Sequence, residues 1–480
     1  MAGTRSMRGD SGADAARHVP APPFFCSLNP ASINRVVGPA PGPGFVPRPA
    51  HGPAPFSPVA ITSIKGFRDV LPSEAARRRE IVDAARRVLE SYGYGEVELP
   101  LLEKGELFSR SVGSTSDIVE KEMYAFEDRD GATIALRPEG TASLVRAFLE
   151  AGLARAQPIS RLWYGGPMFR RERPQKGRYR QFSQIGAEFL GREDAAADAE
   201  TLCLVADICA AVGVRGMRIQ VNSLGDAACR PAYRQMLAVF GRSKLASLCE
   251  DCRARLDRNP LRLLDCKVEG CRTAMEAAPL MVDHLCDDCR SHHTEVLRLV
   301  EAAGVTVEAD PRMVRGLDYY CRTAFEVTGE GQGAQNAIGG GGRYDGLVQS
   351  LGGPDLPGVG FAFGVERLQM ASGDVEARDV SPLVLLAPMG DQAGAQALAL
   401  ARRLRQTGCR IDLESPHRRL KAQMKQADKV GARFVVILGE AELETGRATV
   451  RDLKAQKDHP SLFALTDEAE AIVATLGNLN

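Results

Sequence analysis

The segment around Gly140 places a carboxylate and a hydroxyl, those of Glu139 and Thr141, two residues apart. Together these groups can hold an ammonium ion through charge-assisted hydrogen bonds. The same residues are also typical of a helix N-terminus at which Thr141 caps the first turn. Taken alone, the segment favours the helix cap over the ligand site.

A second polar segment, residues 161–190, is predicted to form two strands around a basic loop. Alternate side chains of a strand share one face, so Gln184, Gly186 and Glu188 are expected to point the same way. Gly186 would leave room between the two polar side chains for a ligand to reach the backbone. A solvated hairpin would not explain two polar side chains opposite an apolar face. The loop carries enough positive charge to bind phosphates, supplied by Arg171, Arg173, Lys176 and Arg178.

Three further segments with glycine or arginine follow in the second half of the chain: residues 315–326 (RGLDYYCRTAFE), 337–347 (AIGGGGRYDGL) and 358–368 (GVGFAFGVERL). The run of four glycines either brings the backbone close against a bound molecule or makes a flexible turn. It matches neither a Walker nor a dinucleotide-binding pattern. In the last segment an apolar strand is predicted to enter a helix that presents Arg367.

Six of the twelve cysteines lie between positions 249 and 289. Two C-x-x-C pairs, Cys249 with Cys252 and Cys286 with Cys289, could build one tetrahedral zinc site. The 33 residues between these pairs exceed the usual zinc-ribbon gap of roughly 15–20. We therefore expect small buried core residues here, with zinc as the alternative, and assign no metal ligand.

The elements that must position these segments can be read from hydrophobic periodicity. A helix is predicted over about 72–93, followed by a short strand at 96–99 that stops at Pro100. Residues 229–305 are predicted to be mostly helical, and strand signals return at 323–328. The last hundred residues alternate apolar runs, typical of buried parallel strands, with helical stretches, which indicates a compact α/β domain. These runs are 383–387 and 434–438, and the helical stretches are 391–406 and 416–430.

Residues 1–60 contain 12 of the 28 prolines, five arginines and no lysine. Such a segment cannot bury enough apolar surface to offset the entropy of ordering it, so we expect a disordered extension. An over-long gene start and an organelle transit peptide are the alternatives. The formal net charge of zero means that any nucleic-acid contact must come from local basic patches. No apolar stretch is long enough to predict a transmembrane helix or a membrane partner.

Taken in order, the five polar segments resemble the signatures of class II histidyl-tRNA synthetases of the bacterial type. FRRE with its basic loop is similar to motif 2, GVGFAFGVERL is similar to motif 3, and the helix and strand ending at Pro100 occupy the place of motif 1, the dimer-forming element. RGLDYYCRTAFE and GGGGRYDGL resemble the two signatures that distinguish the histidine enzymes. The resemblance covers about residues 61–480.

The resemblance implies an α+β fold with an antiparallel-sheet catalytic core at residues 61–378. A helical insertion would occupy about 229–305, and a C-terminal α/β anticodon-binding domain would occupy 382–480. It also implies a cytoplasmic homodimeric histidine–tRNA ligase. Such an enzyme converts L-histidine and ATP, with Mg²⁺, to histidyl-adenylate and then passes histidine to the 3′ end of tRNA(His), releasing AMP and pyrophosphate. The alternative is the synthetase-like regulatory subunit of ATP phosphoribosyltransferase, which lacks the anticodon domain and the catalytic residues.

The resemblance also implies a role for each matching residue. Arg170 and Arg315 would be catalytic, with Arg170 on the α-phosphate and Arg315 between that phosphate and the substrate carboxylate. ATP would be bound by Arg170, Arg315 and Arg367. Histidine would be bound by Glu139, Thr141, Gln184, Glu188, Tyr319 and Tyr320. The acceptor end of tRNA would meet Arg173, Lys176 and Arg178, and the basic helix at 418–429 is suited to phosphate contact.

Overall fold

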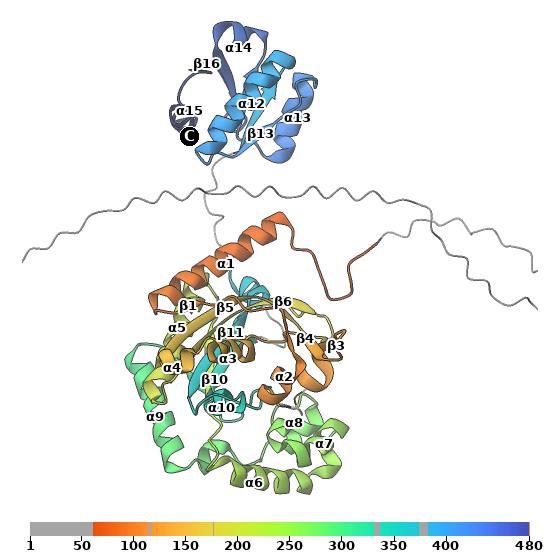
Figure 1. Cartoon of the computed structure of the whole chain (residues 1–480), viewed down its shortest axis with the longest axis vertical. Helices are drawn as coiled ribbons and strands as arrows, with labels where there is room; N and C mark the ends of the chain where they lie inside the picture. Colours follow the sequence, from red (N-terminus) through yellow and green to blue (C-terminus); the bar gives the residue numbers. More distant parts are fainter. Residues whose placement is uncertain are drawn as a thin grey trace, which may run out of the picture. The chain divides into compact units, whose positions relative to one another are not determined.

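The computed structural model describes residues 61–113, 116, 118–175, 177–330, 337–373 and 383–479. The predicted extension at 1–60 and the predicted tRNA contact Lys176 lie outside these residues. Among the described residues, no helix is long and apolar enough to cross a membrane. Residues 63–373 and 383–479 each have their own sheet and core, and each is described separately below (Figure 1).

The first of these parts is built on an eight-stranded sheet with the order β1-β5-β6-β11-β10-β9-β7-β8. Its strands are β1 (Gly95–Glu96), β5 (Ser160–Phe169), β6 (Gln181–Leu190), β7 (Arg218–Ser223), β8 (Glu308–Ala309), β9 (Cys321–Thr328), β10 (Ala337–Arg343) and β11 (Gly358–Gly364). Only the edge pairs β1–β5 and β7–β8 are parallel. The predicted antiparallel core is therefore confirmed, although the first strand is shorter than the expected 96–99.

One face of this sheet carries the main apolar core. Ile185, Ala187 and Phe189 of β6 point into it and leave the even-numbered residues of that strand on the other face, as the alternation predicts. The helices that cover this face are α1 (Pro72–Ser91), α5 (Ala195–Val212), α9 (Asp287–Ala302) and α11 (Val365–Ala371). The helix predicted near 72–93 is thus confirmed as α1, and Pro72 begins it because its missing N–H is not needed in the first turn.

The opposite face carries the polar segments. Here α3 (Thr141–Glu150) packs with Tyr164, Met168 and Tyr344 in a second apolar cluster. A small antiparallel sheet of order β2-β4-β3 immediately precedes α3 in the sequence. The remaining elements of this region are β2 (Leu102–Lys104), α2 (Gly105–Ser111), η1 (Ile118–Glu122), β3 (Tyr124–Glu127), β4 (Thr133–Leu136), α4 (Leu153–Ala156) and α10 (Leu347–Ser350).

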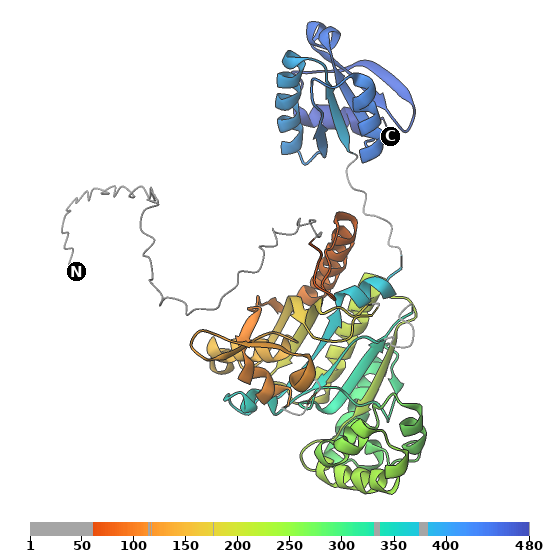
Figure 2. The same cartoon turned by 90° about the vertical axis from the view of Figure 1, so that its right-hand side faces the viewer.

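The predicted helical insertion follows β7 and has a core of its own, which includes five buried cysteines. Figure 2 shows its helices in green, gathered to one side of the strands. They are α6 (Arg230–Ser243), η2 (Leu245–Ser247), α7 (Glu250–Arg258), η3 (Pro260–Leu263), α8 (Glu269–Ala274) and η4 (Met281–His284). The last helix of the predicted stretch, α9, contributes to the main core instead, through Val296 and Val300.

The C-terminal part has a five-stranded sheet of order β13-β12-β14-β15-β16. The two predicted apolar runs form the parallel neighbours β12 (Val384–Pro388) and β14 (Phe434–Leu438). The antiparallel hairpin of β15 (Arg447–Asp452) and β16 (Lys457–Ala464) was not predicted. The other elements are α12 (Asp391–Gln406), β13 (Ile411–Leu413), α13 (Leu420–Val430), α14 (Glu440–Thr445) and α15 (Ala469–Gly477).

Candidate active site

A cavity of about 330 Å³ opens on the polar face of the eight-stranded sheet. Its walls come from the start of α3, the neighbouring strands β5, β6, β11 and β10, the segment before β9, and α11. Segments far apart in the sequence thus meet at one place. The cavity is lined by nine of the predicted site residues: Glu139, Thr141, Arg170, Arg178, Gln184, Arg315, Tyr319, Tyr320 and Arg367.

Glu139 joins the start of α3 to the cavity. Its carboxylate accepts the backbone N–H of Thr141 at 2.7 Å and that of Ala142 at 3.0 Å, so it satisfies two of the unpaired donors of the helix. The predicted cap by Thr141 is therefore wrong, because Glu139 makes the capping bonds. Burial raises the pKa of the Glu139 carboxyl above its usual range, and the two N–H groups oppose that shift. The segment is both a helix cap and part of the cavity wall.

Glu188 lies behind Thr141 and does not line the cavity. It is fully buried on β6, where its carboxyl accepts the Thr141 hydroxyl at 2.7 Å and also the Tyr344 hydroxyl. Burial raises the pKa of Glu188 to about 8, so at neutral pH this carboxyl is mostly protonated. Tyr344 had no predicted role, although it lies in the GGGGRYDGL segment.

Gly186 does not leave room for a ligand, and that prediction is wrong. Tyr164 is its direct cross-strand neighbour on β5, and a Cβ at Gly186 would lie 2.3 Å from the Tyr164 hydroxyl. A Cβ at Gly140 would lie 2.1 Å from the same ring. Both glycines therefore make space for Tyr164, a cavity residue that the sequence reading missed. Only the pairing register of β5 and β6, which places Tyr164 opposite Gly186, could have identified this residue from the sequence.

In addition to Nε of Arg178, three buried polar atoms of cavity residues have no hydrogen-bond partner among the described residues. They are the Tyr164 hydroxyl, Oε1 of Gln184 and Nε of Arg315. Buried polar groups are almost always paired in folded proteins, because an unpaired group loses its bonds to water without replacement. The three atoms therefore indicate a bound polar molecule with both donors and acceptors.

Arg170 and Arg367 bring positive charge to one end of the cavity. Nε of Arg170 donates to the carbonyl of Pro138 at 2.8 Å, and its guanidinium lies 5.3 Å from the centre of the Phe182 ring. Arg367 donates to the carbonyl of Ala337 at 2.8 Å from Nη1. Burial and the like charges of Arg178 and Arg170 lower the pKa of Arg367. Converging cations of this kind are typical of a site for phosphate groups.

Arg315 lies across the glycine run and contacts Glu326 of β9. The run is a strand and not a flexible turn, because Gly339–Gly342 pair with both β9 and β11. A Cβ at Gly340 would lie 2.7 Å from a guanidinium nitrogen of Arg315, and one at Gly341 would lie 2.0 Å from the carbonyl of Gly360. The absence of a side chain at Gly340 therefore lets the Arg315 guanidinium lie close against the sheet.

Tyr319 and Tyr320 form the aromatic side of the cavity. Their ring centroids are 4.7 Å apart in an edge-to-face arrangement, and Tyr319 lies 5.7 Å from the Tyr344 ring. Burial raises the pKa of Tyr320 to about 12, so its hydroxyl keeps its proton and can both donate and accept.

Residues 66–368 match the family model of histidyl-tRNA synthetase. The chain belongs to the histidyl-tRNA synthetase family. Residues 383–466 match the anticodon binding domain. The fold predicted from the resemblance, an antiparallel catalytic core with a helical insertion and an α/β anticodon-binding domain, is thereby confirmed.

Several histidyl-tRNA synthetase relatives are similar over nearly their whole length. The histidine–tRNA ligase of Trichlorobacter lovleyi is 48% identical over 86% of this chain and 99% of its own. That of Syntrophotalea carbinolica is 47% identical over 88% of this chain and 100% of its own. The crystal structure of apo S. aureus histidyl-tRNA synthetase aligns with a TM-score of 0.71 and 33% identity, covering 86% of this chain and 99% of that one.

Only part of the basic loop of motif 2, residues 171–178, lines the cavity. Arg178 lines the cavity and pairs with Glu172 at 2.9 Å. Arg173 is exposed and does not line it, and Lys176 is outside the described residues. The predicted contact of this loop with tRNA stays a prediction.

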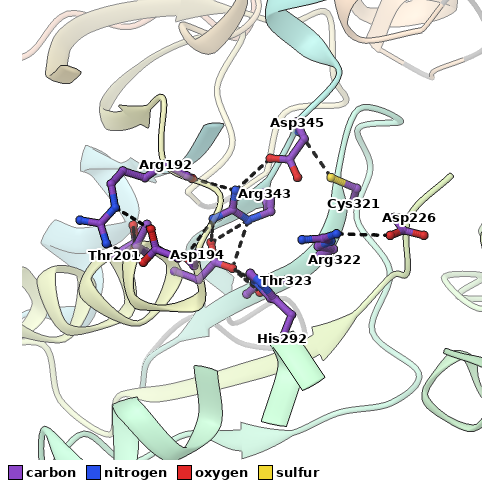
Figure 3. A network of polar contacts seen from close by, with 12 residues as sticks. Arg192, Asp194, Thr201, Asp226, His292, Cys321, Arg322, Thr323, Arg343 and Asp345 are labelled. Carbon is purple, nitrogen blue, oxygen red and sulfur yellow. Dashed lines mark hydrogen bonds and ion pairs between the residues drawn. The ribbon is translucent and has the colours of Figure 1, made fainter. Parts of the chain in front are cut away.

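A buried ionic network supports the end of β10, the strand that contains the glycine run of the family signature. Arg343 is fully buried and pairs with Asp198 at 2.8 Å and with Asp345 at 2.9 Å. His292 of α9 and Thr323 of β9, which Figure 3 labels near Arg343, also bind the Asp198 carboxylate. The network joins α5, α9, β9 and β10, and nothing local in the sequence predicted it.

Proposed function

We propose that this member of the family is a histidine–tRNA ligase that activates L-histidine with ATP and then charges tRNA(His). The observation that carries this proposal is the arrangement around one cavity: the carboxylate of Glu139 at the start of α3, and three arginines, Arg170, Arg315 and Arg367. An amino acid and a nucleoside triphosphate need both kinds of charge. A protein carboxylate binds the ammonium group of the amino acid, and arginines bind its carboxylate and the phosphates.

In the first step a carboxylate oxygen of histidine attacks the α-phosphorus of ATP, and the bond to pyrophosphate breaks. Both reactants are anions, so fixed positive charge between them lowers the barrier. Arg315 is suited to this role because the glycine strand and Glu326 hold its guanidinium in place, while its buried Nε is still unpaired. Arg170 would bind the α-phosphate and Arg367 the outer phosphates. In the second step a ribose hydroxyl of tRNA attacks the acyl carbon and AMP leaves.

The aromatic side of the cavity is proposed to bind the histidine side chain. The imidazole has one N–H donor and one acceptor nitrogen, and the hydroxyls of Tyr164 and Tyr320 can act in either sense. Glu139 and Thr141 would bind the ammonium group, with Gln184 beside them. Glu188 does not line the cavity, so we propose that it influences imidazole binding through Thr141, whose hydroxyl donates a hydrogen bond to it.

Mg²⁺ is proposed to accompany ATP, and the cavity suits such an ion. Glu172 and Glu326 line it, and magnesium prefers carboxylate oxygens together with phosphates. Each of these carboxylates already contacts an arginine, so the phosphates would supply many of the ligands. The ion would offset phosphate charge.

The C-terminal part is proposed to bind the anticodon region of tRNA(His). Lys421, Lys425 and Lys429 are exposed and four residues apart, so they follow one face of α13, while Gln423 and Ala427 are buried. A row of lysines along one helix face is suited to phosphate contact, which positions RNA without reading its sequence.

A cytoplasmic homodimer is proposed from the family resemblance of the motif 1 segment. Large apolar side chains next to this segment are exposed, among them Leu71, Leu101 and Leu102. In addition, β1 is an edge strand of the sheet, and exposed edges are able to pair with a second chain. Light scattering at micromolar concentration should find twice the chain mass of 51.7 kDa, and a stable, active monomer would contradict the dimer.

The regulatory-subunit alternative is not favoured. This chain keeps the three arginines and the anticodon binding domain, which such a subunit would lack. The structure of an ATP phosphoribosyltransferase regulatory subunit/histidyl-tRNA synthetase from Bacillus halodurans is 23% identical, with a TM-score of 0.57, and shows the fold alone.

An ATP–pyrophosphate exchange assay with each amino acid in turn tests the proposed function. Histidine alone should support exchange, and the purified protein should then charge tRNA(His). Arg367→Ala should reduce exchange strongly, whereas the exposed Arg110→Ala on α2 is the matched control and should not. Absence of exchange with every amino acid in a folded protein would refute the proposal.

A further inference from the structure

The cysteines of the insertion do not form a single group around the two C-x-x-C pairs. They separate into two groups of four ligands: Cys249, Cys252, Cys266 and Cys271 in one, and Asp226, Cys229, Cys286 and Cys289 in the other. Within each group the ligand atoms all lie within 4.8 Å of one another. The zinc alternative considered from the sequence, one site at the two C-x-x-C pairs, is therefore wrong, because each pair has a different set of partners.

The distances within the groups fit a single tetrahedral ion. The Cys249 and Cys266 sulfurs are 3.9 Å apart, and so are the Cys229 and Cys289 sulfurs. Four sulfurs at about 2.3 Å from one zinc are separated by ~3.8 Å along each edge of the tetrahedron. A disulfide would bring two sulfurs to about 2.05 Å, and the cysteines are free thiols. The ligands are also too close together to surround a cluster of several iron atoms.

Both C-x-x-C pairs begin a helix, which favours thiolates. Cys249 is the N-cap residue of α7, and Cys286 is that of α9. The positive end of a helix stabilises a nearby thiolate, the form that binds metals. In addition, the backbone N–H of Cys249 donates to the Cys271 sulfur at 3.0 Å, a hydrogen bond of the kind that orients metal ligands.

The second group contains the Asp226 carboxylate, which also contacts an arginine outside the group. Oδ1 of Asp226 lies 3.6 Å from the Cys229 sulfur and 3.9 Å from the Cys286 sulfur. Oδ2 of the same carboxylate faces Arg322 at 3.5 Å (Figure 3). One oxygen is thus directed to the three sulfurs and the other to a cation that offsets the excess negative charge of such a site.

Simple core packing does not explain this arrangement. Cys203 and Cys209 on α5 are ordinary helix residues without a second sulfur in such a group. In the insertion and the loop before it, by contrast, eight ligand residues from four separate stretches of chain form two compact groups. Small domains with a limited apolar core are often stabilised by a structural metal.

We propose that the insertion binds two structural zinc ions, one at Cys249, Cys252, Cys266 and Cys271, and one at Asp226, Cys229, Cys286 and Cys289. All four positions of each ion are filled by protein ligands, which is typical of a structural site and leaves no open position for catalysis. The second ion fixes the loop after β7 beside the segment that carries Tyr320. Two backbone bonds of 2.7 Å, Leu224 N to Arg322 O and Arg322 N to Gly225 O, already join these segments.

Metal analysis of the wild-type full chain tests the proposal without any substitution. Protein purified under reducing conditions should contain about two zinc ions per chain, one for each site. After removal of zinc, Co²⁺ added as a probe should give the d–d and thiolate charge-transfer bands of tetrahedral sulfur coordination. A protein without bound metal and without these bands would overturn the proposal, and stoichiometric iron would overturn its assignment to zinc.

Substitutions then separate the two sites. Cys266→Ser and Cys229→Ser should each reduce the zinc content to about one ion per chain. Cys409→Ser, a half-buried cysteine of the C-terminal part, is the matched control and should keep both ions. A single zinc that neither substitution removes would show instead that the two C-x-x-C pairs share one site. If a variant does not fold, a chelator titration of the wild type decides, because two sites should release about two zinc ions and lower the melting temperature.

Discussion

Replacing Glu188 by glutamine should stabilise the catalytic core relative to the wild type as the pH rises from 5 to 8. Glu188 is fully buried, and its partners are the hydroxyls of Thr141 and Tyr344. Burial raises its pKa from 4.5 to about 8. Glutamine has the same size and is neutral at every pH, so it resembles the protonated carboxyl.

The sign follows from proton binding. Between pH 4.5 and 8 the folded chain keeps a proton on Glu188 that the unfolded chain has released, so the stability of the wild type falls with pH. Each pH unit in this window is worth up to ~1.4 kcal/mol. From pH 5 to pH 7 the wild type should therefore lose up to ~2.5 kcal/mol relative to Glu188→Gln. This corresponds to a melting-temperature difference of roughly 3–6 °C.

The structure supplies a local probe for this measurement. Trp163 is the only tryptophan of the chain, and it is buried on β5 beside the strand of Glu188. Its fluorescence therefore reports unfolding of this core and not of the C-terminal part. Glu150→Gln, which removes an exposed carboxylate on α3, is the matched control and should show no such trend. If the melting curves of Glu188→Gln and wild type shift in parallel with pH, the buried-proton argument is wrong.

The same variant tests the proposed role of Glu188 at the histidine site. A bound imidazole that carries positive charge would lower the pKa of Glu188 and favour its ionised form, which an amide cannot reproduce, and hydrogen bonds to charged groups are worth ~1.5–3 kcal/mol. We expect a higher KM for histidine and an unchanged KM for ATP in pyrophosphate exchange. An unchanged KM for histidine, with unchanged discrimination among amino acids, would refute this role.

Four further changes test the other parts of the argument. Arg315→Ala should reduce adenylate formation by roughly 10²–10³, the usual effect of losing one preorganised donor, while transfer from pre-made histidyl-adenylate to tRNA should fall much less in single-turnover assays. Gly340→Ala should also slow adenylate formation at least ~10-fold, because its Cβ would meet both the Arg315 guanidinium and the carbonyl of Phe325 at 2.7 Å. Asp198→Asn should destabilise the core by ~3–5 kcal/mol in denaturant unfolding, since it leaves the buried Arg343 with one carboxylate fewer. Deleting residues 382–480 should spare histidine-dependent pyrophosphate exchange and abolish tRNA charging, and equal loss of both would show that this part mainly supports the core.

Local patterns in the sequence were enough to predict much of the catalytic scaffold. The alternation of β6 correctly separated Ile185 and Phe189 from Gln184 and Glu188, because the side-chain period of a strand is two whatever it packs against. The start of α1 at Pro72 and the two parallel strands of the C-terminal part also follow from local rules. Recognition of the family came from short segments whose order along the chain is itself a sequence property.

Tertiary structure alone decided which side chains meet. Tyr164 fills the space over Gly186 because of strand register, and Glu139 caps α3 while Thr141 turns to Glu188. Arg343 pairs with Asp198, which lies 145 residues away in the sequence. The cysteines show the reason most clearly: their spacing favoured separate core residues over a shared zinc site, whereas the fold gives each C-x-x-C pair its own partners. Such contacts depend on the positions of whole elements in space, which local periodicity and spacing do not specify.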